Sequence, residues 1–177
     1  MSLNGKFLES LLEFQIGELL RRRNLKLAMV ESCTGGLIGH RITNIPGSSD
    51  YFLGSLVAYA YEAKERLVGV KHETLMTYGA VSKETALELA HGVRQVLSPD
   101  FGMEHIVGLS ITGIAGPGGG LPGKPVGLAW VGLSTPSGEQ AYKILTQGNR
   151  QENKAIFAEQ ALMILNNYLE GTLFPES

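Results

Sequence analysis

The chain has 177 residues, of which 44% are hydrophobic and 18% charged, and this balance excludes an intrinsically disordered protein. The length predicts a single domain over residues 1–177. Fifteen basic and seventeen acidic residues give a net charge of −2. Nucleic acid is therefore not an expected partner, because non-specific binding to phosphates needs a strongly basic surface.

Cysteine, histidine and hydropathy patterns exclude further classes. The single cysteine, Cys33, rules out an internal disulfide and is typical of a cytoplasmic protein. The four histidines are scattered without the spacing of zinc ligands, so no metal site is predicted. No apolar run reaches ~18 residues, and Glu9 and Glu13 interrupt the beginning of the chain, so neither a membrane span nor an export signal is expected.

The first half of the chain predicts helices that flank two strands. Apolar residues spaced by three and four indicate a helix over 7–20, which Arg21, Arg22 and Arg23 close. Further segments are a buried strand over 25–30, a turn over 31–36, a helix over 37–43, a short helix from 47 to 52 or 53, a strand over 55–61 and a helix over 62–68.

The second half predicts a long helix, three strands and a final helix. Ser82 is the expected N-cap of a helix over 82–97. An apolar strand over 105–112 runs into a glycine-rich segment over 113–123, and strands over 126–134 and 140–145 form a hairpin before a helix over 151–169. Helices interspersed with buried strands predict an α/β sandwich with a mixed sheet, whose ligands bind beyond the strand ends.

Several familiar catalytic and binding motifs fail on their context. The glycine-rich segment matches a dinucleotide fingerprint and nearly matches a phosphate-binding loop, but Pro125 replaces the magnesium-binding hydroxyl and a strand follows where a helix is needed. A ligand-facing role and a plain flexible loop both remain open for it. No nucleophile elbow supports a Ser-His-Asp triad. Cys33 fits a buried small apolar residue better than a nucleophile.

A serine activated by lysine remains as a possible chemistry. A hydroxyl needs a base, and a lysine that is desolvated enough to lose its proton near pH 7 can serve. Ser49 and Lys64 are each expected to open a helix around the strand that contains Tyr59. The chain could therefore bring both side chains to one end of that strand, although this spacing permits the pair without establishing it.

Five sequence blocks together resemble one known family. They are 30–37 (VESCTGGL), 45–49 (IPGSS), Tyr59 with 62–64 (EAK), 79–82 (GAVS) and 112–117 (TGIAGP). In this order they closely resemble the CinA carboxy-terminal domain family, known as nicotinamide mononucleotide deamidases, which hydrolyse the carboxamide to nicotinate mononucleotide and ammonia. Larger members carry an additional molybdopterin-binding-like domain, and this chain looks like the stand-alone form.

The resemblance assigns roles to individual residues. It implies that Ser49 is the nucleophile, Lys64 its general base and Tyr59 a hydroxyl that assists proton transfer. If Ser49 is the nucleophile, the backbone N–H groups at the expected helix start, residues 47–50, would stabilise the oxyanion. It also implies a three-layer α/β/α sandwich with a mixed, five-stranded sheet, a homo-oligomer and no metal or cofactor. The residues implied to face a small-molecule nucleotide are Ser32, Thr34, Gly35, Gly36, Thr112 and Gly113, with Arg150 near its phosphate.

The chain departs from the family pattern near Lys64. Tyr61 stands where members commonly have asparagine, Ala60 replaces a small hydroxyl residue, and Gly118 occupies a place often held by aspartate. Two alternatives therefore stay open beside the deamidase: a nucleotide-binding or regulatory module that cleaves nothing, and an amidase that acts on a related amide.

Overall fold

A five-stranded mixed sheet forms the centre of the protein. The computed structural model describes residues 11–98 and 102–173. The sheet has the order β2-β1-β3-β4-β5, in which β1 pairs in parallel with β2 and β3, while β3–β4 and β4–β5 are antiparallel. The strands are β1 (Lys26–Glu31), β2 (Phe52–Val57), β3 (Ile106–Gly113), β4 (Leu128–Thr135) and β5 (Gly138–Leu145).

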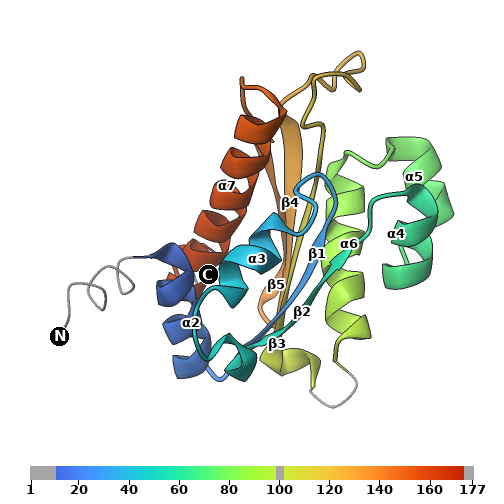
Figure 1. Ribbon diagram of the computed structural model, residues 1–177. Helices are drawn as coiled ribbons and strands as arrows, with labels where there is room; N and C mark the ends of the chain where they lie inside the picture. The colour runs from blue at the N-terminus through green and yellow to red at the C-terminus, as the bar shows by residue number, and fades with distance from the viewer. Residues whose placement is uncertain (1–10, 99–101, 174–177) are drawn as a thin grey trace.

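Helices cover both faces of this sheet (Figure 1). One face carries α2 (Leu12–Arg22), α3 (Leu37–Thr43) and α7 (Arg150–Glu170), and the other carries α4 (Tyr61–Val68), α5 (His72–Tyr78) and α6 (Lys83–Val96). Two short 3-10 helices, η1 (Ser48–Asp50) and η2 (Met103–His105), precede β2 and β3. The predicted three-layer α/β/α sandwich with five strands is confirmed.

Each face of the sheet has its own hydrophobic core. Successive side chains of a strand point to opposite faces, so Leu27 and Met29 of β1 pack in the core below α2, α3 and α7. Ala28 and Val30 pack against Leu89 and the rest of the α4–α6 layer. Burial on both faces explains why β1 reads as one continuous apolar run.

Helix α6 lies unusually close to the sheet. A Cβ atom built on Gly108 or Gly132 would lie 2.1 Å from the backbone oxygen of Ala90 or Ala86, respectively. Only glycine leaves room for the helix backbone at these two positions. The close contact fixes α6 over β3 and β4, and with it the loop that precedes α6.

Two segments differ from the predicted elements. Strand β2 covers Phe52–Val57, whereas the sequence predicts a helix through 52 or 53 and a strand over 55–61. The strand ends early because its partner β1 ends at Glu31, opposite Val57, and the ladder has no further residue to pair with. Helix α5 was not predicted, since its seven residues bury only Thr74 and Leu75. The predicted helix start at residues 7–10 lies outside the described residues.

The directions of the strands decide which loops meet. Strands β1, β2 and β3 run parallel, so the segments that follow them meet at one edge of the sheet, the upper edge in Figure 1. The beginnings of α3, α4 and α7 and the loop between β3 and β4 lie at this edge. Among the helices described, none is both long and apolar enough to cross a lipid bilayer.

Candidate active site

Lys64 is a buried lysine at the upper edge of the sheet. It lies in the first turn of α4, and its side chain folds back toward the segment that joins β2 to α4, leaving it 1% exposed. Its Nζ donates hydrogen bonds of 2.8 Å to the backbone oxygens of Ala58 and Tyr59. The third neighbour of Nζ is the hydroxyl of Ser32, at 3.1 Å.

The environment of Lys64 favours its neutral form. Burial lowers the pKa of Lys64 from 10.5 to about 8, because the charged ammonium loses hydration. A neutral amine has two N–H groups and one lone pair. The two carbonyl oxygens of Ala58 and Tyr59 accept the two N–H groups, which leaves the lone pair directed at the third neighbour, Ser32. The geometry suits an amine that accepts a proton from a serine hydroxyl.

Ser32 occupies the first position after β1. Its backbone N–H donates to the carbonyl of Ile111 in β3, so the sheet ladder holds the residue in place. The chain then turns sharply through Gly35 and Gly36, both at positive φ, into α3. Ser32 is 8% exposed and therefore sits at the border between the interior and the solvent.

Glu31 organises the turn that carries Ser32. Its carboxylate is 1% exposed. One oxygen accepts hydrogen bonds from the Thr34 hydroxyl and the backbone N–H groups of Gly36 and Ile38, and the other accepts from Gly39 N–H and the Ser55 hydroxyl. Five donors thus converge on one buried side chain, which ties the turn 31–36 and the start of α3 to the end of β1.

We expect Glu31→Gln to destabilise the protein by roughly 2–4 kcal/mol, because the amide nitrogen would face two or three N–H or O–H donors with no acceptor to offer them. Urea unfolding followed by circular dichroism measures this change. Glu62→Gln is the matched control, since Glu62 lies exposed in the first turn of α4 and should change stability by less than ~0.5 kcal/mol. Equal stabilities of the two variants would contradict the role of Glu31.

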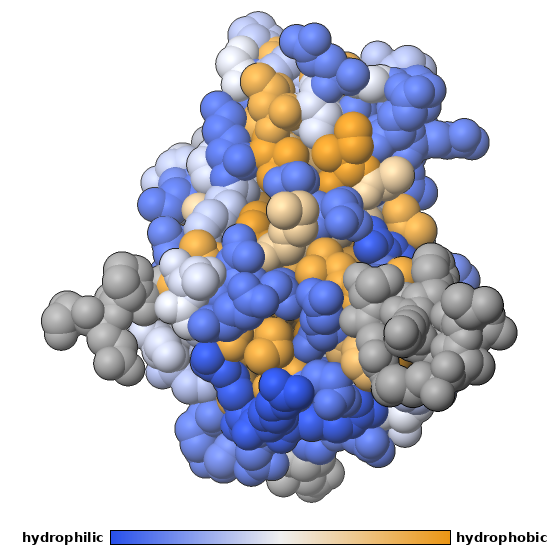
Figure 2. Space-filling view, turned by 90° about the vertical axis from the view of Figure 1, so that its left-hand side faces the viewer, coloured by the Kyte–Doolittle hydropathy of each residue, from blue (hydrophilic) through white to orange (hydrophobic). Residues whose placement is uncertain are grey.

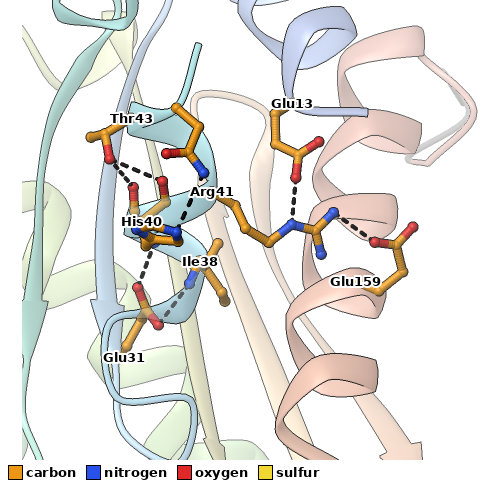
Figure 3. A network of polar contacts seen from close by, with 9 residues as sticks. Glu13, Glu31, Ile38, His40, Arg41, Thr43 and Glu159 are labelled. Carbon is orange, nitrogen blue, oxygen red and sulfur yellow. Dashed lines mark hydrogen bonds and ion pairs between the residues drawn. The ribbon is translucent and has the colours of Figure 1, made fainter. Parts of the chain in front are cut away.

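Helix α3 is also fixed at its other end (Figure 3). The guanidinium of Arg41 donates to Glu13 of α2 and, at 2.7 Å, to Glu159 of α7. Figure 3 shows Arg41 between these two carboxylates, while Glu31 contacts the opposite end of α3. The turn 31–36 is therefore attached to β1 on one side and to a braced helix on the other, which pre-organises Ser32.

A cavity of about 220 Å³ opens beside this turn. The glycine-rich segment between β3 and β4 forms one wall through Gly113, Gly116, Gly118 and Gly119, and Cys33, Tyr59 and Arg150 line the rest. Of the two readings of this segment, the ligand-facing position is the one the structure supports. A Cβ atom on Gly118 would have no other atom within 4 Å, so the cavity is open at this residue.

Tyr59 and Arg150 lie together at the mouth of the cavity. Arg150, the first residue of α7, donates to the backbone oxygen of Gly116 at 2.7 Å and to the Tyr59 hydroxyl at 3.0 Å. The Tyr59 ring is 59% exposed. Only the backbone oxygen of Tyr59 contacts Lys64, so its hydroxyl belongs with Arg150, and the predicted help in proton transfer gains no support from a direct contact.

Other residues predicted to face a nucleotide have structural roles. The Thr34 hydroxyl bonds to Glu31, and Gly36 donates its N–H to the same carboxylate. The Thr112 hydroxyl donates to the backbone oxygen of Ala80 on the other side of β3. Each of the two hydroxyls thus donates its proton within the protein, so their contact with a ligand stays a prediction, while Gly113 lines the cavity.

Ser49 lies at the opposite edge of the sheet from Lys64. It belongs to η1, which comes before β2, whereas Lys64 follows β2. The neighbouring Asp50 and Gly47 bond to Lys26 at the start of β1 and to Arg21 at the end of α2. A six-residue strand separates the two edges, a distance of roughly 20 Å.

The predicted Ser49–Lys64 pair is therefore wrong, and so are the predicted oxyanion donors at residues 47–50. Ser49 and Lys64 were expected to meet because each was predicted to open a helix beside one strand. Strand β2 lies between the two residues in the chain, so they are found at its opposite ends. Figure 2 shows that the lower end of the molecule, where α2 ends in Figure 1, is covered by hydrophilic residues, and Ser49 is exposed there.

Cys33 remains a buried apolar residue rather than a nucleophile. Burial raises the pKa of its thiol to about 12, which leaves almost no thiolate at neutral pH. The backbone at Cys33 and Thr34 and the Lys64 amine lower this pKa, but by less than burial raises it. Within residues 11–98 and 102–173, no three His, Cys, Asp or Glu side chains gather in a way that could hold a metal ion.

Comparisons with known proteins agree with this architecture. Residues 9–169 match the family described as CinA C-terminal domain. The chain belongs to the CinA C-terminal domain family. A competence-damage inducible protein of Halothermothrix orenii is 49% identical to the CinA domain over 163 residues, which make up 92% of this chain. The chain spans 38% of the length of that relative.

Solved structures carry the same fold as this CinA domain. A competence/damage inducible protein of Agrobacterium tumefaciens is 37% identical with a TM-score of 0.76, and the match covers 88% of this chain and 96% of that one. A CinA superfamily protein of Klebsiella pneumoniae has a TM-score of 0.83 at 25% identity, with coverages of 90% and 96%. Both support the three-layer arrangement on which the site depends.

The sequence interpretation missed the roles of two adjacent residues in the CinA domain. Ser32 was expected only to contact a nucleotide, and Glu31 was given no role. The signal was their position at the carboxyl end of a buried strand and before a glycine pair, because ligand sites of α/β sheets lie beyond the carboxyl ends of their strands. Ser49, by contrast, precedes a strand.

Proposed function

We propose that this CinA domain is a serine amidohydrolase that hydrolyses the carboxamide of nicotinamide mononucleotide to nicotinate mononucleotide and ammonia, with Ser32 as nucleophile and Lys64 as its base. The proposal rests above all on the 3.1 Å contact between the Ser32 hydroxyl and the buried Lys64 amine. The substrate class comes from the family resemblance. The pairing of the two residues comes from the geometry.

The first half of the reaction forms an ester with Ser32. Neutral Lys64 accepts the hydroxyl proton while Ser32 Oγ attacks the carboxamide carbon, which gives a tetrahedral oxyanion. Backbone N–H groups of the turn that follows Ser32 are the candidate donors for this oxyanion, and such donors typically contribute ~100–1000-fold in rate. The Lys64 ammonium then returns the proton to the leaving nitrogen, and ammonia departs.

The second half regenerates the enzyme. Lys64, again neutral, takes a proton from a water molecule that attacks the ester carbon, and Ser32 Oγ leaves with that proton to give the carboxylate product. In both halves, Ser32 and Lys64 are the only residues of the protein that transfer a proton. The exposed guanidinium of Arg150 at the mouth of the cavity fits a phosphate contact that orients the nucleotide.

The rate of hydrolysis should rise with pH through the pKa of Lys64, at about 8. Only the neutral amine accepts the Ser32 proton, so each pH unit below that pKa lowers its fraction, and the rate, about tenfold. We expect kcat/KM at pH 6 to be ~100-fold below its plateau above pH 9. A profile that is flat from pH 6 to pH 9 would contradict a lysine base with this pKa.

Ammonia release from nicotinamide mononucleotide, measured on the purified chain in the presence of EDTA, tests the proposed function. Metal-independent release at a rate proportional to enzyme supports the deamidase. Nucleotide binding without ammonia identifies the non-catalytic module instead. Activity only on a different carboxamide identifies the related amidase. A homo-oligomer belongs to the same proposal, and light scattering on the purified chain measures it.

A further inference from the structure

A second cavity lies on the α6 side of the sheet. Its volume is about 530 Å³, against about 220 Å³ for the cavity near Ser32, and this volume falls in the range of small-molecule sites. Trp130 of β4 and Lys143 of β5 lie on one wall, Lys83 at the start of α6 on another, and Lys124 of the glycine-rich segment on a third.

The cations of this cavity lack acidic partners. Lys83, Lys124 and Lys143 line it together with one acidic residue, Glu84, although the whole chain has a net charge of −2. None of these lysines forms an ion pair within the described part of the chain. Lys124 donates to the backbone oxygen of Tyr78, a neutral group. Three cations and a single carboxylate along one cavity favour the binding of an anion there.

Aromatic and apolar groups lie next to these cations. Trp130 pairs with Lys143 across the β4–β5 ladder, so both side chains point to the same face of the sheet. The indole is partly exposed, and Tyr78, Leu128 and Val81 extend the lining. A planar ring can stack on such an indole, while phosphate oxygens accept hydrogen bonds from the lysines.

The second cavity is separate from the Ser32–Lys64 site. The glycine-rich segment contributes Gly118 and Gly119 to the first cavity and Gly123 to the second, where Lys124 follows it, so the segment lines both cavities from between them. The end of β3 separates them as well, because the Thr112 hydroxyl bonds to Ala80 in the loop before α6. A ligand in the second cavity would not touch the reacting groups.

We propose that this cavity, formed by Trp130, Lys83, Lys124 and Lys143, is a second binding site for a nucleoside monophosphate, with the base against Trp130 and the phosphate among the lysines. It is independent of the proposed deamidation. The test is direct because Trp130 is the single tryptophan of the chain, so intrinsic tryptophan fluorescence reports on this cavity alone.

The probe is adenosine monophosphate, titrated into the full chain carrying Ser32→Ala. We expect saturable quenching of Trp130, with adenosine and inorganic phosphate each binding at least ~10-fold more weakly, because each offers only half of the contacts. The Lys83→Ala/Lys143→Ala double variant should weaken binding at least ~10-fold. Lys71→Ala, at an exposed lysine before α5, is the matched control and should bind as tightly as the parent.

Three results would overturn this site. They are no saturable quenching up to ~10 mM adenosine monophosphate, which is weaker than a specific pocket should bind; equal affinity for phosphate alone; and an unchanged affinity in the double lysine variant. The outcome does not depend on the deamidase, since the protein titrated lacks the Ser32 hydroxyl. Ammonia release could therefore fail while this site binds, or the reverse.

Discussion

Ser32→Ala should lower the rate of ammonia release from nicotinamide mononucleotide by at least ~1000-fold, because removal of a nucleophile leaves only the contribution of binding and oxyanion donors. The Ser32 hydroxyl lies 3.1 Å from the base, and alanine keeps the fold of the turn, since the backbone N–H of residue 32 still bonds to Ile111. Steady-state kinetics with an ammonia-coupled assay measures the change. Binding of the nucleotide should persist.

Ser49→Ala is the matched control. The change is chemically identical, but Ser49 is exposed at the other edge of the sheet, roughly 20 Å away along the strands. We expect its rate to stay within about twofold of the parent, as is usual for surface substitutions away from a site. A large loss of activity in Ser49→Ala with little loss in Ser32→Ala would contradict Ser32 as the nucleophile. It would support Ser49, the nucleophile that the family resemblance implies.

Lys64→Met should lower kcat by ~100–10,000-fold, the usual contribution of a general base. Methionine approximates the length of lysine without an amine, and Lys64→Arg adds a second test because a guanidinium stays protonated and cannot accept the Ser32 proton. Both variants should be inactive across the pH range in which the parent gains activity. An arginine variant with the parent's rate would argue against a base at this position.

The stability of Lys64→Met separates lost catalysis from lost folding. The fold lowers the pKa of Lys64 from its ordinary value of 10.5 to about 8, so the unfolded chain holds the proton up to a higher pH. The free energy of unfolding of the parent should therefore rise by up to ~3 kcal/mol between pH 8 and 10.5. Below pH 8 the buried ammonium of Lys64 destabilises the fold by this full amount. Urea unfolding of Lys64→Met should lack this rise. An identical rise in parent and variant would contradict the lowered pKa.

Local patterns in the sequence were sufficient for most of the fold. The apolar run of β1 and the capped helix that begins after Ser82 follow from periodicity and capping. The edge strand β2 was misplaced because its end depends on where its partner β1 stops, which is a tertiary fact. Helix α5 is too short for a clear period. Neither feature can be read from neighbouring residues alone.

The candidate site was predicted in part for the same reason. Lys64 was predicted as the base, and the structure gives it a different serine neighbour from the predicted one, because the direction of β2 places residues before and after the strand at opposite edges. Ser32 and Lys64 are 32 positions apart and meet only because β1 and β2 are parallel neighbours. The carboxylate of Glu31 likewise gathers its donors from α3 and β2, which no local pattern reveals.

Site-specific labelling tests the central assignment most directly. Phenylmethylsulfonyl fluoride forms a stable adduct with a serine that a neighbouring base activates, and trypsin places Ser32 on peptide 27–41, where it is the only serine, and Ser49 on peptide 42–64. Mass spectrometry should find the adduct on 27–41 in step with loss of ammonia release, and much more slowly in Lys64→Met. An adduct on 42–64 that accompanies inactivation, or no adduct on 27–41, would contradict Ser32 as the nucleophile.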